Sequence, residues 1–340
     1  MEKKITTKKI IFRADGNSNT GLGHLYRLFA LVEIYKSDFN IVFVTREDTV
    51  LEVIPSAYPI EIIPKRISLV NESKWLKTFF NPKNCTVIAD GYQFVSSYQK
   101  SIKEEGFSLI YIDDLTTEYM YADLVINHSP FVKKTDFKSE VYTNFLLGTD
   151  YAMLRPLFLK AVKEKNSINK INTVFVCFGG ADFFDLSLKT AKALLSFDEI
   201  IEINVIIGGA YKHKTIFELA KENQKVKLYS NLDEITLFNL IKKCNFGVVP
   251  CSTISYEVCC VGLPFIGGYY VENQKNIYKG FLNNNIFFDG DNYENKSVQD
   301  FQELIQEALN TPLDLHNQKL NNQYELFNKN QKKTFLSLLK

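Results

Sequence analysis

The sequence predicts an α/β protein built from two Rossmann-like domains that face each other across a cleft. Apolar, β-branched runs alternate with amphipathic stretches, and this pattern occurs twice over similar lengths of chain. Parallel strands that are covered by helices on both faces give such nearly continuous apolar runs. The 340 residues suit two domains of about 150 residues each, and the hydrophobic fraction of 46% is ordinary for a globular chain.

The first half contains five runs that are typical of buried strands, at residues 10–13, 41–45, 86–90, 109–113 and 124–127. Helical periodicity lies between several of them, at residues 24–36, 70–80 and 93–105. The second half shows the same alternation, with strands expected at residues 172–178, 202–207, 226–229, 246–249 and 263–266. Its helices are expected at residues 183–196, 213–223, 233–243, 252–260 and 273–283.

The polar, charged stretch near residues 156–170 marks the expected domain boundary. We therefore expect a first domain over 1–155, a second over 156–315, and a terminal helix over 316–340 that packs back on the first domain. We also expect a monomer.

Composition excludes some partners and favours one compartment. The net charge of +1 gives no general field that would attract nucleic acid or an anionic membrane. No apolar run approaches the roughly 20 residues that span a bilayer, and the N-terminus lacks the apolar core of a signal peptide. The six cysteines form no C-x-x-C pair, so buried, reduced thiols in a cytoplasmic protein are expected.

Ligands of doubly wound sheets bind at the carboxyl ends of the strands. In the first half this rule selects Arg13 and Asp15, Asp90-Gly91-Tyr92, Asp113-Asp114 and Asn127-His128. Gly21 and Gly23 lie in a Gly-rich turn between a strand and a helix, where backbone N–H groups can approach a ligand. His24, one of four histidines, ends that turn, and it is either a base near neutral pH or a helix cap.

In the second half, the same rule selects Gly179-Gly180-Ala181-Asp182, Gly208-Gly209 and Pro250-Cys251-Ser252-Thr253. Gly179 and Gly180 allow a diphosphate to approach the backbone, and Asp182 is the expected N-cap of the next helix; a tight turn without ligand is the alternative. Ser252 and Thr253 open another helix and either donate to phosphate or cap it, and Glu257 can bridge ribose hydroxyls. The amides of Asn273 and Gln274 begin a helix and either reach a sugar or face solvent.

A metal site receives less support. Asp90, Asp113 and Asp114 are carboxylates at strand ends, but such residues more often cap helices or hold loops, so no metal and no cofactor is expected. The incomplete G-x-G-x-x-G pattern also argues against an NAD-dependent oxidoreductase.

Taken in order, the motifs resemble those of the PseG family. They are R-x-D-x₅-G-x-G-H, D-G-Y, I-D-D, L-G-T-D-Y-A-x-L-R, G-G-A-D, S-x-x-S-Y-E and E-N-Q, and they cover about residues 8–290. The family consists of UDP-2,4-diacetamido-2,4,6-trideoxy-β-L-altropyranose hydrolases of pseudaminic acid synthesis, related to MurG. The resemblance therefore implies the GT-B fold. Two features depart from it: the chain is longer at its C-terminus, and Tyr256 precedes the helix glutamate where asparagine is common.

The resemblance also implies roles for individual residues. His24 corresponds to the family's proposed general base, and Tyr92 and Asn273 correspond to residues that line the sugar site. Gly179, Gly180, Ser252 and Glu257 correspond to residues that hold UDP. In the implied reaction, His24 takes a proton from the water that attacks C1, UDP leaves, and the anomeric centre is inverted; Asp15 or another strand-end carboxylate orients the imidazole. A glycosyltransferase of the same fold and a non-catalytic nucleotide-sugar-binding protein are the alternatives.

Overall fold

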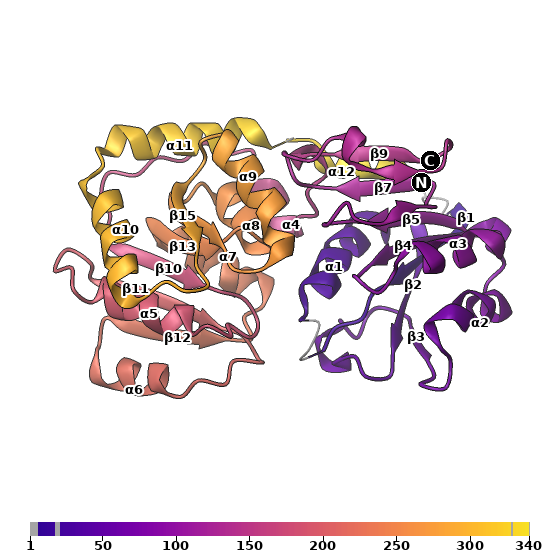
Figure 1. Ribbon diagram of the computed structural model, residues 1–340, viewed down its shortest axis with the longest axis horizontal. Coiled ribbons are helices and arrows are strands. Elements are labelled where there is room, and N and C mark those ends of the chain that lie inside the picture. The colour runs from indigo at the N-terminus through magenta and orange to yellow at the C-terminus, as the bar shows by residue number, and fades with distance from the viewer. Residues whose placement is uncertain (1–5, 18–20, 328, 340) are drawn as a thin grey trace. The chain divides into compact units, whose positions relative to one another are not determined.

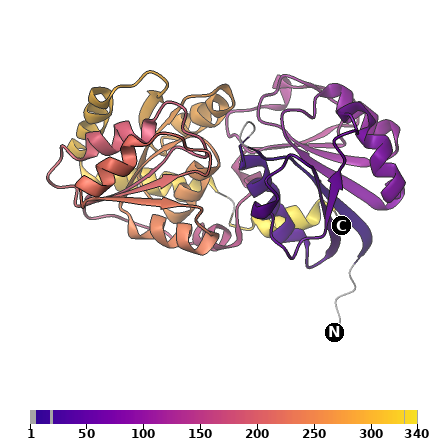
Figure 2. The ribbon, with the colours of Figure 1, turned by 90° about the horizontal axis from the view of Figure 1, so that it is seen from below.

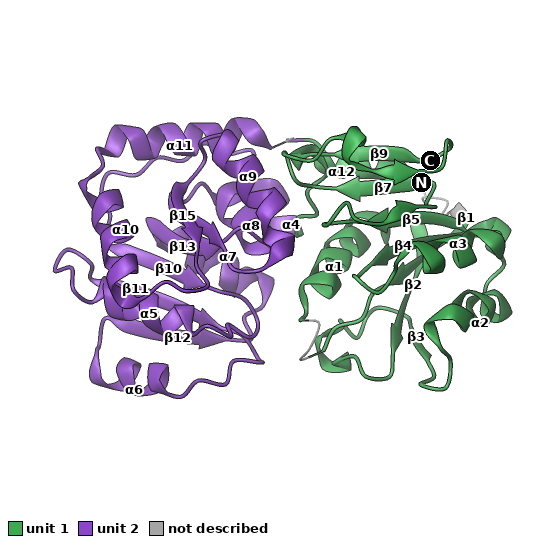
Figure 3. Ribbon diagram, viewed as in Figure 1, with its two compact units in different colours: residues 1–155, 330–340 green, residues 156–329 purple. Residues whose placement is uncertain are grey.

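The computed structural model describes residues 6–17, 21–327 and 329–339, and the chain divides into two units. Unit 1 consists of residues 1–155 and 330–340, and unit 2 consists of residues 156–329 (Figure 3). Each unit is built on a parallel sheet (Figure 1).

The sheet of unit 1 has the strand order β3-β2-β1-β4-β5-β7-β9, with every neighbouring pair parallel. Its strands are β1 (Thr6–Arg13), β2 (Phe39–Arg46), β3 (Ile60–Ile63), β4 (Cys85–Asp90), β5 (Ser108–Ile112), β7 (Leu124–Asn127) and β9 (Asn144–Leu147). A separate two-stranded sheet pairs β6 (Tyr119–Met120) with β8 (Lys138–Ser139). The helices are α1 (Gly23–Tyr35), α2 (Glu72–Phe79), α3 (Ser96–Glu104) and α12 (Gln331–Ser337).

Helices cover both faces of this sheet. α1 and α12 pack together on one face, and α2 and α3 pack together on the other (Figure 2). Apolar side chains from β1, β2, β4 and β5 are buried beneath α2 and α3, among them Ile11, Val44, Val87 and Leu109. The continuous apolar runs of the sequence therefore correspond to strands that are buried on both faces.

Unit 2 contains a six-stranded parallel sheet of order β12-β11-β10-β13-β14-β15. Its strands are β10 (Thr173–Cys177), β11 (Glu202–Ile207), β12 (Val226–Ser230), β13 (Phe246–Pro250), β14 (Phe265–Tyr269) and β15 (Phe288–Asn292). Its helices are α4 (Pro156–Ala161), α5 (Leu186–Leu194), α6 (Thr215–Glu222), α7 (Glu234–Lys243), α8 (Thr253–Val261), α9 (Lys275–Asn283), α10 (Val298–Asn310) and α11 (Leu313–Leu326). α5 packs with α10, and α8 packs with α4, α7 and α11.

The terminal segment differs from the single helix expected over 316–340. It forms two helices, because the backbone becomes extended at Phe327 (φ −103°, ψ 138°) after α11. α11 is part of unit 2, whereas α12 is part of unit 1. There the Tyr35 hydroxyl donates to the Phe335 carbonyl at 2.7 Å and the Gln331 amide donates to the Thr149 carbonyl at 2.8 Å.

Within the described ranges, no helix combines the length and the apolar character that crossing a bilayer requires.

Candidate functional site

Each sheet has one point at which its strand order reverses, and the selected residues gather there. In unit 1 this point lies between β1 and β4, which pair in parallel with Arg13 opposite Ala89. In unit 2 it lies between β10 and β13. The loops that leave two such strands run to opposite sides of the sheet and open a crevice at their carboxyl ends. This topology brings His24 to Asp90 in unit 1.

His24 lies in the first turn of α1 and is oriented by a carboxylate from β4. Its Nδ1 is 2.7 Å from Oδ1 of Asp90, and both side chains are buried. The strand-end carboxylate next to the imidazole is therefore Asp90 rather than Asp15. Nothing in the sequence indicated this pair, since the two partners are 66 positions apart.

The neighbours of Asp90 decide which ring nitrogen carries the proton. Arg27 donates to both oxygens of Asp90, from Nε at 2.9 Å and from Nη2 at 2.6 Å, so this carboxylate acts as an acceptor. The short contact with His24 then requires a proton on Nδ1, although Nη2 of Arg27 also lies 2.9 Å from that nitrogen. Neutral His24 consequently has Nε2 as its proton-accepting nitrogen.

Arg27 was not predicted as a site residue. It follows His24 by three positions on α1, so the two side chains share one helix face. Besides binding Asp90, its Nη1 donates to Oδ1 of Asp114 at 2.7 Å. Burial disfavours the charge of Arg27, but Asp114 and Asp90 outweigh that effect and raise its pKa. The signal available in the sequence was an arginine on the otherwise apolar face of a helix.

Tyr92 lies beside His24 in the loop after β4. The two rings meet edge to face with centroids 4.7 Å apart, and the Tyr92 hydroxyl donates to Oδ2 of Asp114 at 3.4 Å. Tyr92 is nevertheless 41% exposed. This tyrosine therefore presents a partly open surface next to the imidazole.

Gly21 lies in the turn before α1, and Gly23 is the first residue of that helix. Gly21 has φ +74°, in the left-handed region that glycine tolerates best, and its N–H donates to the Asn17 carbonyl at 2.9 Å. A Cβ added at Gly21 or at Gly23 would meet no atom within 4 Å. The remaining residues of this turn, 18–20, lie outside the described ranges.

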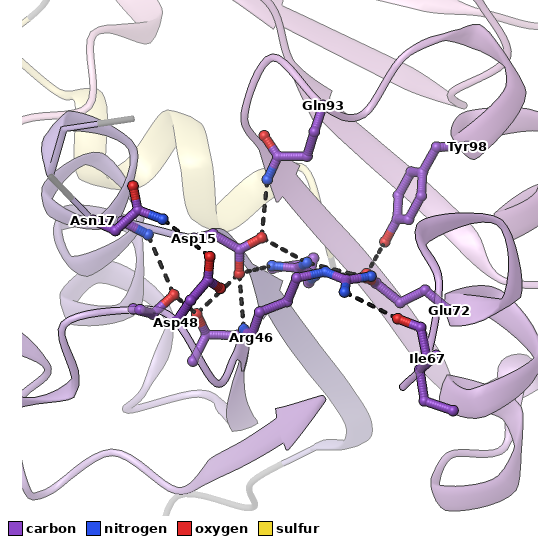
Figure 4. Close-up of polar contacts among 12 residues, drawn as sticks. Asp15, Asn17, Arg46, Asp48, Ile67, Glu72, Gln93 and Tyr98 are labelled. Atoms are coloured by element: carbon purple, nitrogen blue, oxygen red, sulfur yellow. Dashed lines mark hydrogen bonds and ion pairs between the residues drawn. The ribbon is translucent and has the colours of Figure 1, made fainter. Parts of the chain in front are cut away.

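Arg13 and Asp15 belong to a buried ionic network instead of the His24 cluster. Arg13 is 0% exposed, and its guanidinium donates to both oxygens of Asp15 and to both oxygens of Glu72. Asp15 also accepts from the Arg46 N–H at 2.9 Å and from the Gln93 amide at 3.1 Å (Figure 4). Burial raises the pKa of Asp15, but Arg13 outweighs it and lowers that pKa overall. Arg13 and Asp15 thus connect β1 to β2 and α2, and their expected contact with a substrate stays a prediction.

In unit 2, Gly179 and Gly180 form the exposed turn after β10. Gly179 has φ +82°. A Cβ on Gly208 would lie 2.3 Å from the Cα of Gly180, so the loop after β11 can pass this turn only without a side chain. The Ala210 N–H also donates to the Gly180 carbonyl at 3.1 Å, which holds the turn.

Asp185, not the predicted Asp182, is the N-cap residue of α5, and its side chain makes no capping hydrogen bond; the start of the helix is bound instead by the side chain of Asp182. Its two carboxylate oxygens accept from the N–H groups of Leu186 and Ser187, each at 2.8 Å. These are N–H groups that an anion would use at a helix N-terminus. The Asp182 carboxylate therefore occupies the start of α5, and its expected contact with UDP stays a prediction.

α8 begins differently. Ser252 is its N-cap residue, but its side chain makes no capping hydrogen bond, and Thr253 is partly exposed beside it. Glu257 lies one turn further on and is buried. Neither N-cap residue, Asp185 of α5 or Ser252 of α8, makes a side-chain capping hydrogen bond, but the first N–H groups of α5 are bonded by Asp182.

The two amide side chains before α9, Asn273 and Gln274, differ in burial. Gln274 is buried, and its Oε1 accepts from the Tyr270 N–H at 2.9 Å, so it holds the turn after β14. Asn273 is half-buried in the short 3₁₀ turn Glu272–Gln274. Of the two, Asn273 has the more accessible side chain.

Two buried groups near the His24 cluster have displaced pKa values. Burial raises the pKa of Asp113 to about 6. Burial and the charge of Arg27 together lower the pKa of His128 to about 4. Within the described part of the chain, no three or more His, Cys, Asp or Glu residues are arranged to hold a metal ion, and all six cysteines are buried free thiols.

Comparison with known proteins finds three relatives by sequence, which are 25–28% identical to this chain. An uncharacterised protein of Methanocaldococcus jannaschii is 28% identical over 289 residues, which are 81% of this chain and 58% of that relative, so the chain spans little more than half of its length. The UDP-2,4-diacetamido-2,4,6-trideoxy-β-L-altropyranose hydrolase of Campylobacter jejuni is 28% identical over 279 residues, 78% of this chain and 93% of that enzyme. No family model matches the chain.

Comparison of structures identifies the fold. MurG of Acinetobacter baumannii superimposes with a TM-score of 0.66, covering 97% of this chain and 99% of that one at 10% identity. The resemblance noted in the motifs is confirmed: the chain is related to the PseG family and has the GT-B fold of MurG-like proteins.

Proposed function

We propose that this protein is a nucleotide-sugar hydrolase. It releases UDP from a UDP-linked 2,4-diacetamido-2,4,6-trideoxyhexose in pseudaminic acid biosynthesis, by attack of water at C1 with inversion. The observation that carries the proposal is the contact of His24 with Asp90, which leaves Nε2 as a base beside a partly exposed tyrosine. The sequence relationship to the Campylobacter jejuni hydrolase supports the same chemistry.

The proposed reaction uses unit 1 for the chemical step. Nε2 of His24 takes a proton from water while the water oxygen forms a bond to C1. The bond between C1 and the diphosphate oxygen breaks, and its electron pair leaves with UDP. A diphosphate is a good leaving group, so the main requirement is a positioned base, which contributes about 10²–10⁴-fold to the rate. Tyr92 contacts the sugar.

Recognition of UDP is assigned to unit 2. The exposed backbone of Gly179 and Gly180 and the first turn of α8, at Ser252 and Thr253, would bind the diphosphate through N–H and hydroxyl donors. Glu257 would accept from the ribose hydroxyls, and Asn273 would contact the sugar. Asp182 and Gln274 keep their observed roles of holding the turns nearby.

A glycosyltransferase is the second candidate, because MurG shares the fold. Such an enzyme would use the same base to deprotonate an acceptor hydroxyl. The observation that favours the hydrolase is the sequence relationship, which extends over 78% of this chain. The proposal also includes a monomer that acts in the cytoplasm, which gel filtration and cell fractionation test.

Hydrolysis in ¹⁸O-labelled water tests the proposal. The UDP-linked sugar is incubated with the full chain, without any acceptor, and ¹H and ³¹P NMR follow the sugar and UDP. We expect free sugar of inverted anomeric configuration at first appearance, with ¹⁸O on C1 and none in UDP. Release only after addition of an acceptor would establish a transferase. Tight UDP binding with no turnover of any UDP-sugar would indicate a non-catalytic nucleotide-sugar-binding protein.

A further inference from the structure

Arg27 joins the two carboxylates that hold the two side chains of the proposed chemical step. Its Nε and Nη2 bind Asp90, which contacts His24, and its Nη1 binds Asp114, which accepts from the Tyr92 hydroxyl. One guanidinium thus spans β4 and the loop after β5. Only arginine offers five donors in a rigid plane that can serve two carboxylates at once.

The position of Arg27 on α1 fixes where its side chain lies relative to His24. His24 and Arg27 are three residues apart on α1, and both are buried. Residues at this spacing lie next to each other on one face of a helix. The helix therefore sets the distance between the imidazole and the guanidinium, and the Asp90 carboxylate accepts a hydrogen bond from each of them.

The charges around the imidazole come from four elements. Arg27 is on α1, Asp90 ends β4, Asp114 follows β5, and His128 follows β7; the Tyr92 ring lies beside them at its edge. Burial raises the pKa of Asp114, but Arg27 outweighs it, so this pKa falls to about 2. With His128 uncharged because its pKa is lowered to about 4, the cluster contains two negative charges and one positive charge near neutral pH.

We propose that Arg27 is a positioning residue of the hydrolase: it holds Asp90 and Asp114 in place and offsets one of their charges, so that His24 is neutral, with its proton on Nδ1, when water is attacked. This inference rests on the proposed function. Without Arg27, two buried carboxylates would face the imidazole unopposed, and they would stabilise its protonated form. The imidazolium has no free nitrogen with which to accept a proton from water.

Histidine NMR tests the inference without any need for turnover. The full chain is labelled with ¹³C and ¹⁵N in its four histidines, and His24→Gln identifies the His24 signals. The titration of His24 is then followed in the wild type and in Arg27→Met. We expect the pKa of His24 to rise by about one unit or more in Arg27→Met, as is usual when carboxylates within about 4–6 Å lose their counter-charge.

Two further variants separate charge from geometry. In Arg27→Met/Asp114→Asn the cluster around His24 has the same net charge as in the wild type. The pKa of His24 should therefore return toward its wild-type value. Arg27→Lys keeps the charge but lacks the planar fork, so it should leave the pKa nearly unchanged and lower kcat by about 10–100-fold with little change in KM. The matched control is Arg66→Met, which removes an exposed arginine of unit 1.

The outcomes are distinct. A folded Arg27→Met protein with a wild-type His24 titration would overturn the inference, and so would a wild-type ¹⁵N signature with the proton on Nε2. If Arg27→Met does not fold, the double variant decides through its His24 pKa, and a raised value there contradicts the charge argument. A protein that hydrolyses no UDP-sugar but shows the expected titrations would refute the proposed function and leave the role of Arg27 in setting the His24 proton intact.

Discussion

At the scale of single residues, the role of His24 depends on its neighbours. An imidazole at the start of a helix can cap that helix, bind a metal or accept a proton. Here Asp90 contacts one nitrogen, which leaves the other to act as a base. The strand-end rule selected Asp90 and the Gly-rich turn pointed to His24, but neither paired them, because the pairing depends on β1 and β4 being neighbours in the sheet.

The same rule selected Arg13 and Asp15, which the structure places in a network with Glu72. Glu72 is on α2, and nothing in the sequence around Arg13 indicates that this carboxylate would reach it. A charged residue at the end of a strand is compatible with a ligand site and with a buried ion pair. Distinguishing the two requires the long-range contacts.

Replacing His24 by alanine tests the base directly. We expect His24→Ala to lower kcat by about 10²–10⁴-fold, the usual contribution of a general base. Affinity for UDP, measured by calorimetry, should change little. Tyr26→Ala is the matched control, since it removes an exposed ring two positions away on α1. Normal turnover by His24→Ala would remove this residue from the mechanism.

Asp113 and His128 predict an unusual dependence of stability on pH. The pKa of Asp113 is raised to about 6, so its contribution favours the folded state at low pH and is lost as the pH rises from about 4 to about 6. The pKa of His128 is lowered to about 4, so its contribution is present above about 6.5 and is lost as the pH falls toward 4. In the wild type the two effects oppose each other over the same interval.

Asp113→Asn should remove one of these effects and reveal the other. We expect the free energy of unfolding of the variant, relative to that of the wild type, to rise by about 2–3 kcal/mol between pH 4 and pH 6. Urea unfolding at pH 4, 5 and 6 measures it. Asp198→Asn, at an exposed position of unit 2, should show no such trend. Parallel pH profiles for wild type and Asp113→Asn would contradict the raised pKa.

At the scale of elements, the sequence predicted the strands that consist of buried apolar residues better than the strands that lack such a pattern. The ten expected strand runs all overlap observed strands. β15 was missed because its sequence, Phe-Asp-Gly-Asp-Asn, has no apolar pattern, and its extended form depends on pairing with β14. β3 was also missed; it is a four-residue strand at the edge of its sheet.

The missed helix α10 has a clear signal in the sequence. Ser297 and Asp300 form a capping box, and Phe301, Ile305 and Ala308 follow on one buried face. A serine followed three residues later by an acid, just before helical periodicity, is a start signal of this kind. This helix could therefore have been predicted from the sequence, whereas β15 could not.

α12 is expected to stabilise α1, the helix that carries His24 and Arg27. Phe335 is 0% exposed, and its carbonyl accepts from Tyr35 of α1. We expect Phe335→Ala to lower the free energy of unfolding by about 3–5 kcal/mol and to speed hydrogen exchange in α1. Lys332→Ala, an exposed position on the same helix, is the control and should change neither. Unchanged exchange in α1 would show that the two helices are not coupled.

At the scale of the whole molecule, the two units repeat one plan. The orders β3-β2-β1-β4-β5 and β12-β11-β10-β13-β14 are the same, so the reversal point falls after the first strand of each unit. The duplication of the apolar pattern predicted two Rossmann-like units, and the strand-end rule then indicated where to look in each. What the pattern did not reveal was that the terminal segment is shared between the units, because periodicity gives no information on which core a helix joins.

The assignment of UDP to unit 2 and of the base to unit 1 predicts separable variants. We expect Glu257→Ala to weaken UDP binding, measured by calorimetry, without changing the pH dependence of kcat. His24→Ala should do the reverse, with UDP affinity intact. Glu303→Ala, an acid on α10, is the control for Glu257. Unchanged UDP affinity in Glu257→Ala would remove the ribose contact from the proposal.

The return of residues 330–339 to unit 1 affects how the polypeptide matures during translation. Unit 2 is one uninterrupted segment, so it can acquire its structure as soon as residue 329 has left the ribosome. Unit 1 is synthesised first but lacks the helix that covers α1 until residues 330–339 have been added, after the whole of unit 2. The half of the protein that emerges first is therefore the half that is completed last, and a nascent chain stalled before residue 330 would expose Tyr35 to chaperones.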